Sequence, residues 1–310
     1  MTSPQQVAAD IRAAVATTVR GKAQAIDLAL STLLAGGHLL IEDLPGTGKT
    51  LLAKSLAASI GGQFGRVQCT PDLLPTDLTG TSVFRPDTGE WEFRAGPVFA
   101  NVLLVDEINR ASPRTQSALL QPMEEYQVTI DGTTWPLPAP FFCIATQNPF
   151  GQVGTFPLPE SQLDRFSLVL SLGLPDRQAE REIVTGAGGA DLLGKIQPVT
   201  HPQQVAEAIT ATAALYCNDA VVEYVLDLAE ATRTEARLSQ GVSPRASTNL
   251  LRLAQGHAAV AGRDYVTPDD AQAVFVAAFA HRVKVADRVD TLAAAEVLDL
   301  ILAQVRVPRV

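Results

Sequence analysis

The pattern of apolar and polar positions changes near residue 173. Before it, short unbroken apolar runs such as 39–41 and 102–105 alternate with stretches of helical period, which predicts buried parallel strands joined by helices. Beyond it, Ala, Leu and Val recur at helical spacing. The sequence therefore predicts an α/β core over 1–172, with a parallel sheet flanked by helices, followed by an all-α lid domain over 173–310.

Capping residues and apolar stripes define the expected helices. Ser243-Pro244 and Thr267-Pro268 are start signals, each a capping residue followed by proline. Two alternating stretches with turn residues, 81–93 and 127–137, predict hairpins inserted into the α/β pattern. We expect helices at about 4–20, 22–35, 49–60, 116–125, 158–166, 176–185, 202–213, 218–235, 244–261, 268–281 and 290–304.

The composition excludes several classes of protein. Of the 310 residues, 46% are hydrophobic, but the longest apolar runs are far too short to span a membrane. The first twenty residues do not form a secretory signal, and three widely spaced cysteines predict core packing in a reducing cytoplasm. A net charge of −9 without a Lys/Arg-rich run argues against a nucleic-acid partner. We expect a cytoplasmic protein with no membrane insertion.

The stretch Asp43–Thr50 lies between an apolar run and a helix start, which is the context of a phosphate-binding P-loop. Gly46 and Gly48 allow backbone N–H groups to turn inward around an anion. Lys49 would reach the β- and γ-phosphates, and the Thr50 hydroxyl would hold Mg²⁺. The residues expected to bind the nucleotide here are Pro45, Gly46, Thr47, Gly48, Lys49, Thr50 and Leu51.

Asp43 departs from the usual pattern, which has glycine at this position of G-x-x-x-x-G-K-[ST]. An acidic residue is compatible with the loop only if its carboxylate points away from the phosphates. The alternative interpretation is a chance Gly-Lys-Thr in a turn, which the preceding strand and following helix disfavour.

Two carboxylates follow the apolar run 102–105, at the end of a predicted buried strand. Asp106 would hold Mg²⁺, and Glu107 would orient and deprotonate the attacking water. Asn148 ends another buried strand and would emerge beside them, where it could hold the same water. The alternatives are an exposed Asp-Glu pair and an Asn-Pro turn at a strand end.

Two arginines are further candidates. Arg165 follows a short helix, and its functional interpretation requires a neighbouring subunit; the alternative is a surface salt bridge to Asp164 or Glu160. Arg245 lies in the first turn of its helix, where the helix dipole disfavours a cation. A bound nucleotide would remove that conflict, whereas the alternative is a solvated arginine.

The ordered motifs resemble those of AAA+ ATPases, and specifically the MoxR family, over nearly the whole chain. The most specific are 37–50, Leu103–Arg110, Ala145–Pro149 (ATQNP), Leu158–Phe166 (LPE-x-QLDRF) and Ser243–Arg245. Members commonly carry an acidic residue before the P-loop, as at Asp43.

The resemblance implies roles for residues and segments. Asn148 would be sensor 1, Arg165 an arginine finger supplied in trans, and Arg245 sensor 2 in the lid. The two hairpins would be the helix-2 insert and the pre-sensor-1 hairpin, both projecting toward the pore of a ring that is usually hexameric. A partner with a von Willebrand A domain is also implied, while the client protein is not identified.

The sequence therefore predicts a Mg²⁺-dependent ATPase that acts as a chaperone-like remodeller of partner proteins. Lys49, Glu107, Asn148 and Arg165 would be catalytic, with ATP as substrate and Thr50 and Asp106 at the metal. One alternative is a nucleic-acid-associated AAA+ motor or loader, against which the acidic charge counts. The other is a nucleotide-gated scaffold without turnover, which Glu107 and Arg165 disfavour.

Overall fold

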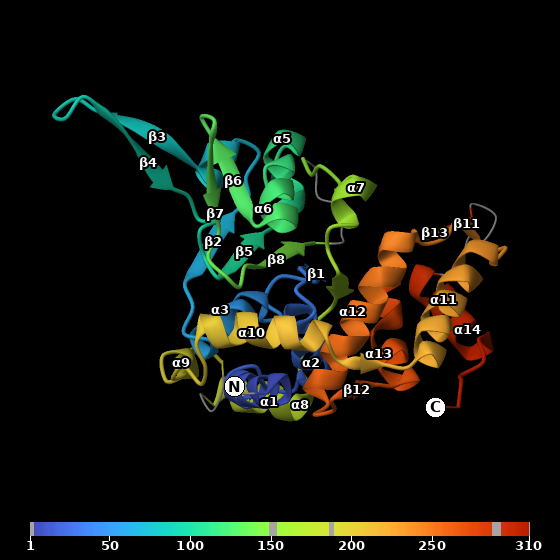
Figure 1. Cartoon of the computed structure of the whole chain (residues 1–310). Helices are drawn as coiled ribbons and strands as arrows, with labels where there is room; N and C mark the ends of the chain where they lie inside the picture. The colour runs from blue at the N-terminus through green and yellow to red at the C-terminus, as the bar shows by residue number, and fades with distance from the viewer. Residues whose placement is uncertain (1–2, 149–153, 186–188, 287–292, 310) are drawn as a thin grey trace.

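A five-stranded parallel sheet forms the centre of the N-terminal part of the protein (Figure 1). Its strand order is β2-β5-β8-β1-β9. The strands are β1 (Leu39–Glu42), β2 (Phe64–Gln68), β5 (Val102–Asp106), β8 (Phe142–Gln147) and β9 (Leu168–Leu170). The computed structural model describes residues 3–148, 154–185, 189–286 and 293–309. The predicted parallel sheet is confirmed.

Alternate residues of the central strands enter two different cores, which explains why these strands are unbroken apolar runs. Leu39 and Ile41 pack in the larger core, with the helices on one face. Leu40, between them, packs in a second core on the opposite face. Both faces are therefore covered, and only the strand ends are available for polar chemistry.

Helices and hairpins in this part of the chain surround the sheet. The helices are α1 (Pro4–Ala16), α2 (Ala23–Leu34), α3 (Lys49–Ser59), α4 (Pro75–Thr79), α5 (Pro113–Ser117), α6 (Leu120–Glu125), α7 (Glu160–Leu163) and the 3₁₀ turn η1 (Ile108–Arg110). The helix expected at 116–125 is wrong as one piece, because α5 and α6 are separate. Pro122 lacks the N–H that a continuous helix would donate to Ala118.

Two hairpins project from the same side of the sheet (Figure 1). They are formed by β3 (Gly80–Arg85) with β4 (Glu90–Ala95), and by β6 (Gln127–Ile130) with β7 (Thr133–Pro136). The second turns at Asp131-Gly132, both at positive φ, as two-residue hairpins require. Phe93 of β4 stacks on Trp135 of β7 with ring centroids 4.7 Å apart, so the hairpins contact each other.

The C-terminal part is helical, as predicted, with three additions. Its helices are α8 (Arg177–Val184), α9 (Ala190–Leu193), α10 (Pro202–Ala213), α11 (Asp219–Thr234), α12 (Pro244–Val260), α13 (Pro268–Phe279) and α14 (Ala294–Gln304). The sequence analysis missed α9 and two short strand pairs: β10 (Tyr216–Cys217) with β12 (Tyr265–Val266), and β11 (Leu238–Gln240) with β13 (Lys284–Val285). Residues 290–292 of the last expected helix lie outside the described residues.

Helix α12 of the lid is anchored on the N-terminal part of the chain. Gly256 of α12 lies against the backbone of α2, where an added Cβ would sit 2.2 Å from the carbonyl oxygen of Ser31. Asn249 Nδ2, nearer the start of α12, donates to the carbonyl of Ser167 at 2.7 Å. These contacts fix where the N-terminal end of α12, and therefore Arg245, lies. Within the described part of the chain, no helix combines the length and apolarity that a membrane crossing needs.

Candidate nucleotide-binding site

The P-loop runs from the end of β1 to the start of α3, as the sequence predicted. Gly46 and Gly48 have φ values of 85° and 98°, which side chains rarely adopt. A Cβ at either glycine would meet no heavy atom within 4 Å, so the space over the loop is open. Gly48 caps α3 without a side-chain hydrogen bond, which leaves first-turn N–H groups available to an anion.

Lys49 and Asp43 lie at opposite ends of this loop. The Lys49 ammonium donates to the carbonyl oxygens of Asp43, at 3.2 Å, and Leu44, at 2.6 Å. Burial lowers the pKa of Lys49, against the opposing effect of the carboxylates around it. The Asp43 carboxylate accepts the N–H groups of Leu44, at 2.9 Å, and Gly173, at 2.8 Å. Each oxygen of the Asp43 carboxylate therefore accepts a hydrogen bond from a backbone N–H group.

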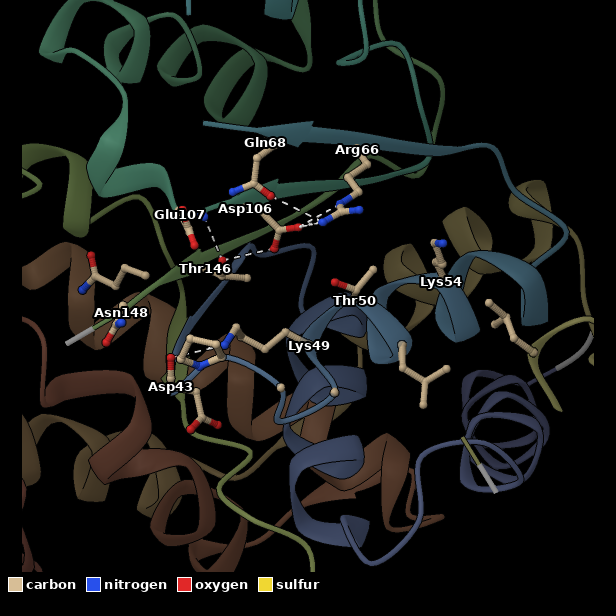
Figure 2. A pocket seen from close by; sticks show the side chains of 16 residues that line it. Asp43, Lys49, Thr50, Lys54, Arg66, Gln68, Asp106, Glu107, Thr146 and Asn148 are labelled. Atoms are coloured by element: carbon tan, nitrogen blue, oxygen red, sulfur yellow. Dashed lines mark hydrogen bonds and ion pairs between the residues drawn. The ribbon is translucent and has the colours of Figure 1, made fainter. Parts of the chain in front are cut away.

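Asp106 ends the buried strand β5 and is itself buried. Its Oδ2 accepts a 2.8 Å hydrogen bond from Arg66 Nε, and its Oδ1 accepts a 3.3 Å hydrogen bond from the Thr146 hydroxyl (Figure 2). Arg66 lies on β2, the strand paired with β5. A guanidinium thus stands beside the carboxylate that was predicted to hold Mg²⁺.

Glu107 is held by its backbone in an uncommon conformation. Its φ of 54° and ψ of 50° are left-handed, which costs about 1 kcal/mol or more for a residue other than glycine. Its N–H donates to the Thr146 hydroxyl at 2.9 Å, and its carboxylate accepts Arg110 at 2.9 Å. Thr146 therefore bridges the two carboxylate residues and fixes their relative position.

One cavity of ≈ 450 Å³ brings together most of the predicted site residues (Figure 2). It is lined by Asp43, Pro45, Gly46, Gly48, Lys49, Thr50, Leu51, Lys54, Arg66, Gln68, Asp106, Glu107, Thr146, Gln147, Asn148 and Leu193. Asn148 reaches it because β8 lies between β1 and β5, and the three strands end at the same edge. Pro149 of the ATQNP motif lies outside the described residues.

The donors in the cavity fit a magnesium ion. The Thr50 hydroxyl and the Asp106 carboxylate are hard oxygen donors, and both line the cavity. The cation already beside Asp106, the guanidinium of Arg66, indicates that this position favours positive charge. Mg²⁺ commonly binds through one or two protein ligands together with phosphates and water, so these two oxygen donors are sufficient.

Arg165 and Arg245 come together elsewhere. Both guanidiniums pair with Glu124 at the end of α6, Arg245 at 2.9 Å, and Arg245 also lies 3.7 Å from Asp164. Neither arginine is among the described residues that line the P-loop cavity. Burial and the neighbouring charge of Arg245 lower the pKa of Arg165. The structure therefore separates the two predicted arginines from the other site residues of the same chain.

Several residues of the site escaped the sequence analysis. Arg66 lies on β2, and its position next to β5 depends on the strand order. Thr146 lies inside the ATQNP motif. Its hydroxyl, one residue before the end of a buried strand, was the signal that could have identified it. Glu124 carried no local signal, because its partners lie about 40 and 120 residues away along the chain.

Two models of known protein families match parts of this chain. Residues 38–168 match the model of the ATPase family associated with various cellular activities (AAA), and residues 230–300 match that of the AAA lid domain. The chain is 41% identical over 281 residues to Chaperone MoxR1 of Mycobacterium tuberculosis, covering 84% of this chain and 71% of that protein. It is 32% identical over 300 residues to Protein MoxR of Paracoccus denitrificans, covering 88% and 87%.

Two further proteins are similar over most of the chain. YeaC of Bacillus subtilis, which is uncharacterised, is 44% identical over 262 residues, covering 84% of this chain and 82% of YeaC. A crystal structure of a protein from Cytophaga hutchinsonii, provisionally described as an ATPase, superimposes with a TM-score of 0.90 at 35% identity. It covers 99% of this chain and 96% of its own.

Proposed function

Because this chain belongs to the MoxR family of AAA+ ATPases, we propose that it hydrolyses ATP at the interface between two copies of itself and uses the reaction to remodel partner proteins. The observation that carries the proposal is the separation of two sets of residues. Phosphate-binding and acidic residues share one cavity, while Arg165 and Arg245 share another surface of the same chain.

In the cavity, each group has one task. Lys49 and the P-loop N–H groups bind the β- and γ-phosphates, and Thr50 and Asp106 hold Mg²⁺, which neutralises phosphate charge when bound. Glu107 accepts a proton from the attacking water, and Asn148 orients that water. The left-handed backbone of Glu107 and its bond to Thr146 support this role, because they hold the carboxylate residue in a defined position.

The two arginines act in trans, on nucleotide bound to the neighbouring copy. Arg165 stabilises the charge that develops on the γ-phosphate, an effect of about 10³–10⁵ in rate for trans arginine fingers. Arg245 contacts the same phosphate from the start of α12. It couples the loss of the γ-phosphate to movement of the lid. Their common partner Glu124 supports this pairing, since it keeps the two guanidiniums on one surface.

The hairpins are the parts that contact a client. Trp91 and Phe84 of the β3–β4 hairpin are 71% and 46% exposed, and their rings lie 5.4 Å apart. Exposed aromatic side chains of this kind are common where proteins bind polypeptides. They line the pore of a ring, with six copies by the family resemblance, that works with a von Willebrand A domain partner in the cytoplasm. The free thiols of all three cysteines are compatible with that compartment.

Phosphate release tests the proposed chemistry. Glu107→Gln should still bind ATP but release phosphate at least about 100-fold more slowly, because the general base is lost. Glu230→Gln, the same change at an exposed lid position, should retain the wild-type rate. Normal phosphate release by Glu107→Gln would exclude Glu107 as the base. Added DNA should leave the wild-type rate unchanged; stimulation by DNA would favour the motor or loader alternative.

A further inference from the structure

Two guanidinium groups share a single carboxylate oxygen on the surface that carries Arg165 and Arg245. Oε1 of Glu124 accepts a 2.9 Å hydrogen bond from Arg245 and also pairs with Arg165. The side chains of Glu124, Arg165 and Arg245 are 33%, 22% and 53% exposed. The pairing is thus open to solvent on one side, where another anion could approach.

The charges around this group do not balance. Asp164 is the second carboxylate, but its Oδ1 accepts the nearly buried Arg282 at 2.8 Å and it lies 3.7 Å from Arg245. Arg282 is fixed further by the carbonyls of Asp164 and Phe166. Asp164 is therefore committed mainly to Arg282, and Glu124 is left to neutralise two arginines. Among these paired groups, two carboxylates face three guanidiniums, and an incoming anion would relieve that imbalance.

We propose that Glu124 competes with the neighbouring copy's γ-phosphate for Arg165 and Arg245, and so makes subunit association depend on ATP rather than ADP. This inference rests on the trans role proposed above for the two arginines. ATP presents a terminal phosphate with more charge and more acceptor oxygens than one carboxylate, so it displaces Glu124. ADP lacks that group, and the arginines remain on Glu124.

The sign of the effect separates this role from a merely structural one. If Glu124 competes with phosphate, removing its charge frees the arginines and strengthens association. If Glu124 only keeps the arginines in place, its removal weakens association with any nucleotide. Glu125 offers a matched control, because it is the next residue of α6 and its carboxylate accepts only the amides of Gln121 and Gln127 among the hydrogen bonds described.

The test measures association by sedimentation velocity over a range of protein concentrations, in the Glu107→Gln background that retains ATP. With Glu124→Gln added, the protein concentration for half-assembly with ATP should fall about tenfold, and assembly with ADP should appear. Glu125→Gln should leave both values unchanged, and Glu124→Asp should restore the dependence on ATP. Melting temperatures of all variants identify any that fail to fold, and if Glu124→Gln is one of them, Glu124→Ala, which also removes the charge, carries the comparison with the parent.

Two results would overturn the proposal while leaving the trans site intact. The first is an unchanged assembly concentration in Glu124→Gln, and the second is weaker assembly with both nucleotides. If the Glu107→Gln protein binds ATP but stays monomeric at every concentration, the proposed function and this inference are both overturned.

Discussion

Arg66 Nε lies 2.8 Å from Oδ2 of Asp106, so a cation of the chain itself is paired with a carboxylate that lines the P-loop cavity. The Arg66 side chain is 48% exposed, whereas that of Asp106 is only 9% exposed. The guanidinium can therefore move into solvent, while the carboxylate cannot. This relationship predicts competition between Arg66 and a metal ion for Asp106.

Arg66→Gln should raise the affinity of the site for a divalent ion. An ion pair that is half exposed contributes about 1 kcal/mol, so the expected gain is about fivefold. Mn²⁺ binding in the presence of ATP, followed by electron paramagnetic resonance, measures the affinity directly. Lys54→Gln is the control, because Lys54 lines the same cavity with its ammonium over the Phe64 ring. Weaker Mn²⁺ binding by Arg66→Gln would show that Arg66 supports the metal site instead.

The stack of Phe93 on Trp135 should hold the two hairpins together. The chain has two tryptophans, so Trp91→Phe leaves Trp135 as the sole tryptophan, which is excited selectively over the tyrosines and reports on this contact. In that background, Phe93→Ala should increase acrylamide quenching of Trp135, because an aromatic pair contributing about 0.5–1.5 kcal/mol is lost. Phe84→Ala removes an aromatic ring from the other pair and should not change the quenching. Equal quenching in both variants would indicate that the hairpins are independent.

His38 should make folding stability depend on pH. Its Nδ1 accepts the Cys143 N–H at 3.2 Å and its Nε2 donates to the Met123 carbonyl at 2.8 Å, so the buried ring is neutral. Burial lowers its pKa from 6.5 to about 4. The unfolded chain therefore binds more protons between these values, and stability is lost as pH falls below 6.5.

Urea unfolding at pH 7.5 and 5.5 measures this loss. For the wild type, His38 should account for about 1 kcal/mol of lost stability at pH 5.5. His281, whose pKa burial lowers to about 3, adds a similar share. His38→Gln keeps a donor and an acceptor but cannot titrate, so it should lose less stability over the same interval. An identical loss in both proteins would contradict the neutral state of His38.

Local signals in the sequence were sufficient for much of the fold and the cavity. The glycines before Lys49 predict the loop, and the apolar run before Asp106 predicts the strand. Both are short-range patterns that can be recognised without knowing how the rest of the chain packs. Parallel strand ends meet at one edge, so Asn148 could be expected near Asp106 without knowing the strand order in detail.

Features that depend on distant packing could not be predicted in this way. The Arg66–Asp106 pair requires β2 to lie beside β5. The meeting of Arg165 and Arg245 requires α12 to pack on α2 at Gly256, a contact that no pattern around Arg245 indicates. Neither arginine lines the P-loop cavity of its own chain. Their contact with a nucleotide bound to a second copy of the chain therefore remains a prediction.

Mixing inactive variants tests the shared site most directly. Each interface needs Lys49 from one copy and Arg165 from the other, so Lys49→Ala and Arg165→Ala are inactive alone. Mixed in equal amounts, they should recover roughly a quarter of the wild-type ATPase rate, because random assembly pairs the intact halves at one interface in four. Arg245→Ala should be rescued in the same way by Lys49→Ala but not by Arg165→Ala. Phosphate release from the three mixtures is the measurement, and an inactive mixture of Lys49→Ala with Arg165→Ala, in particles shown to contain both, would contradict hydrolysis at a site shared between copies.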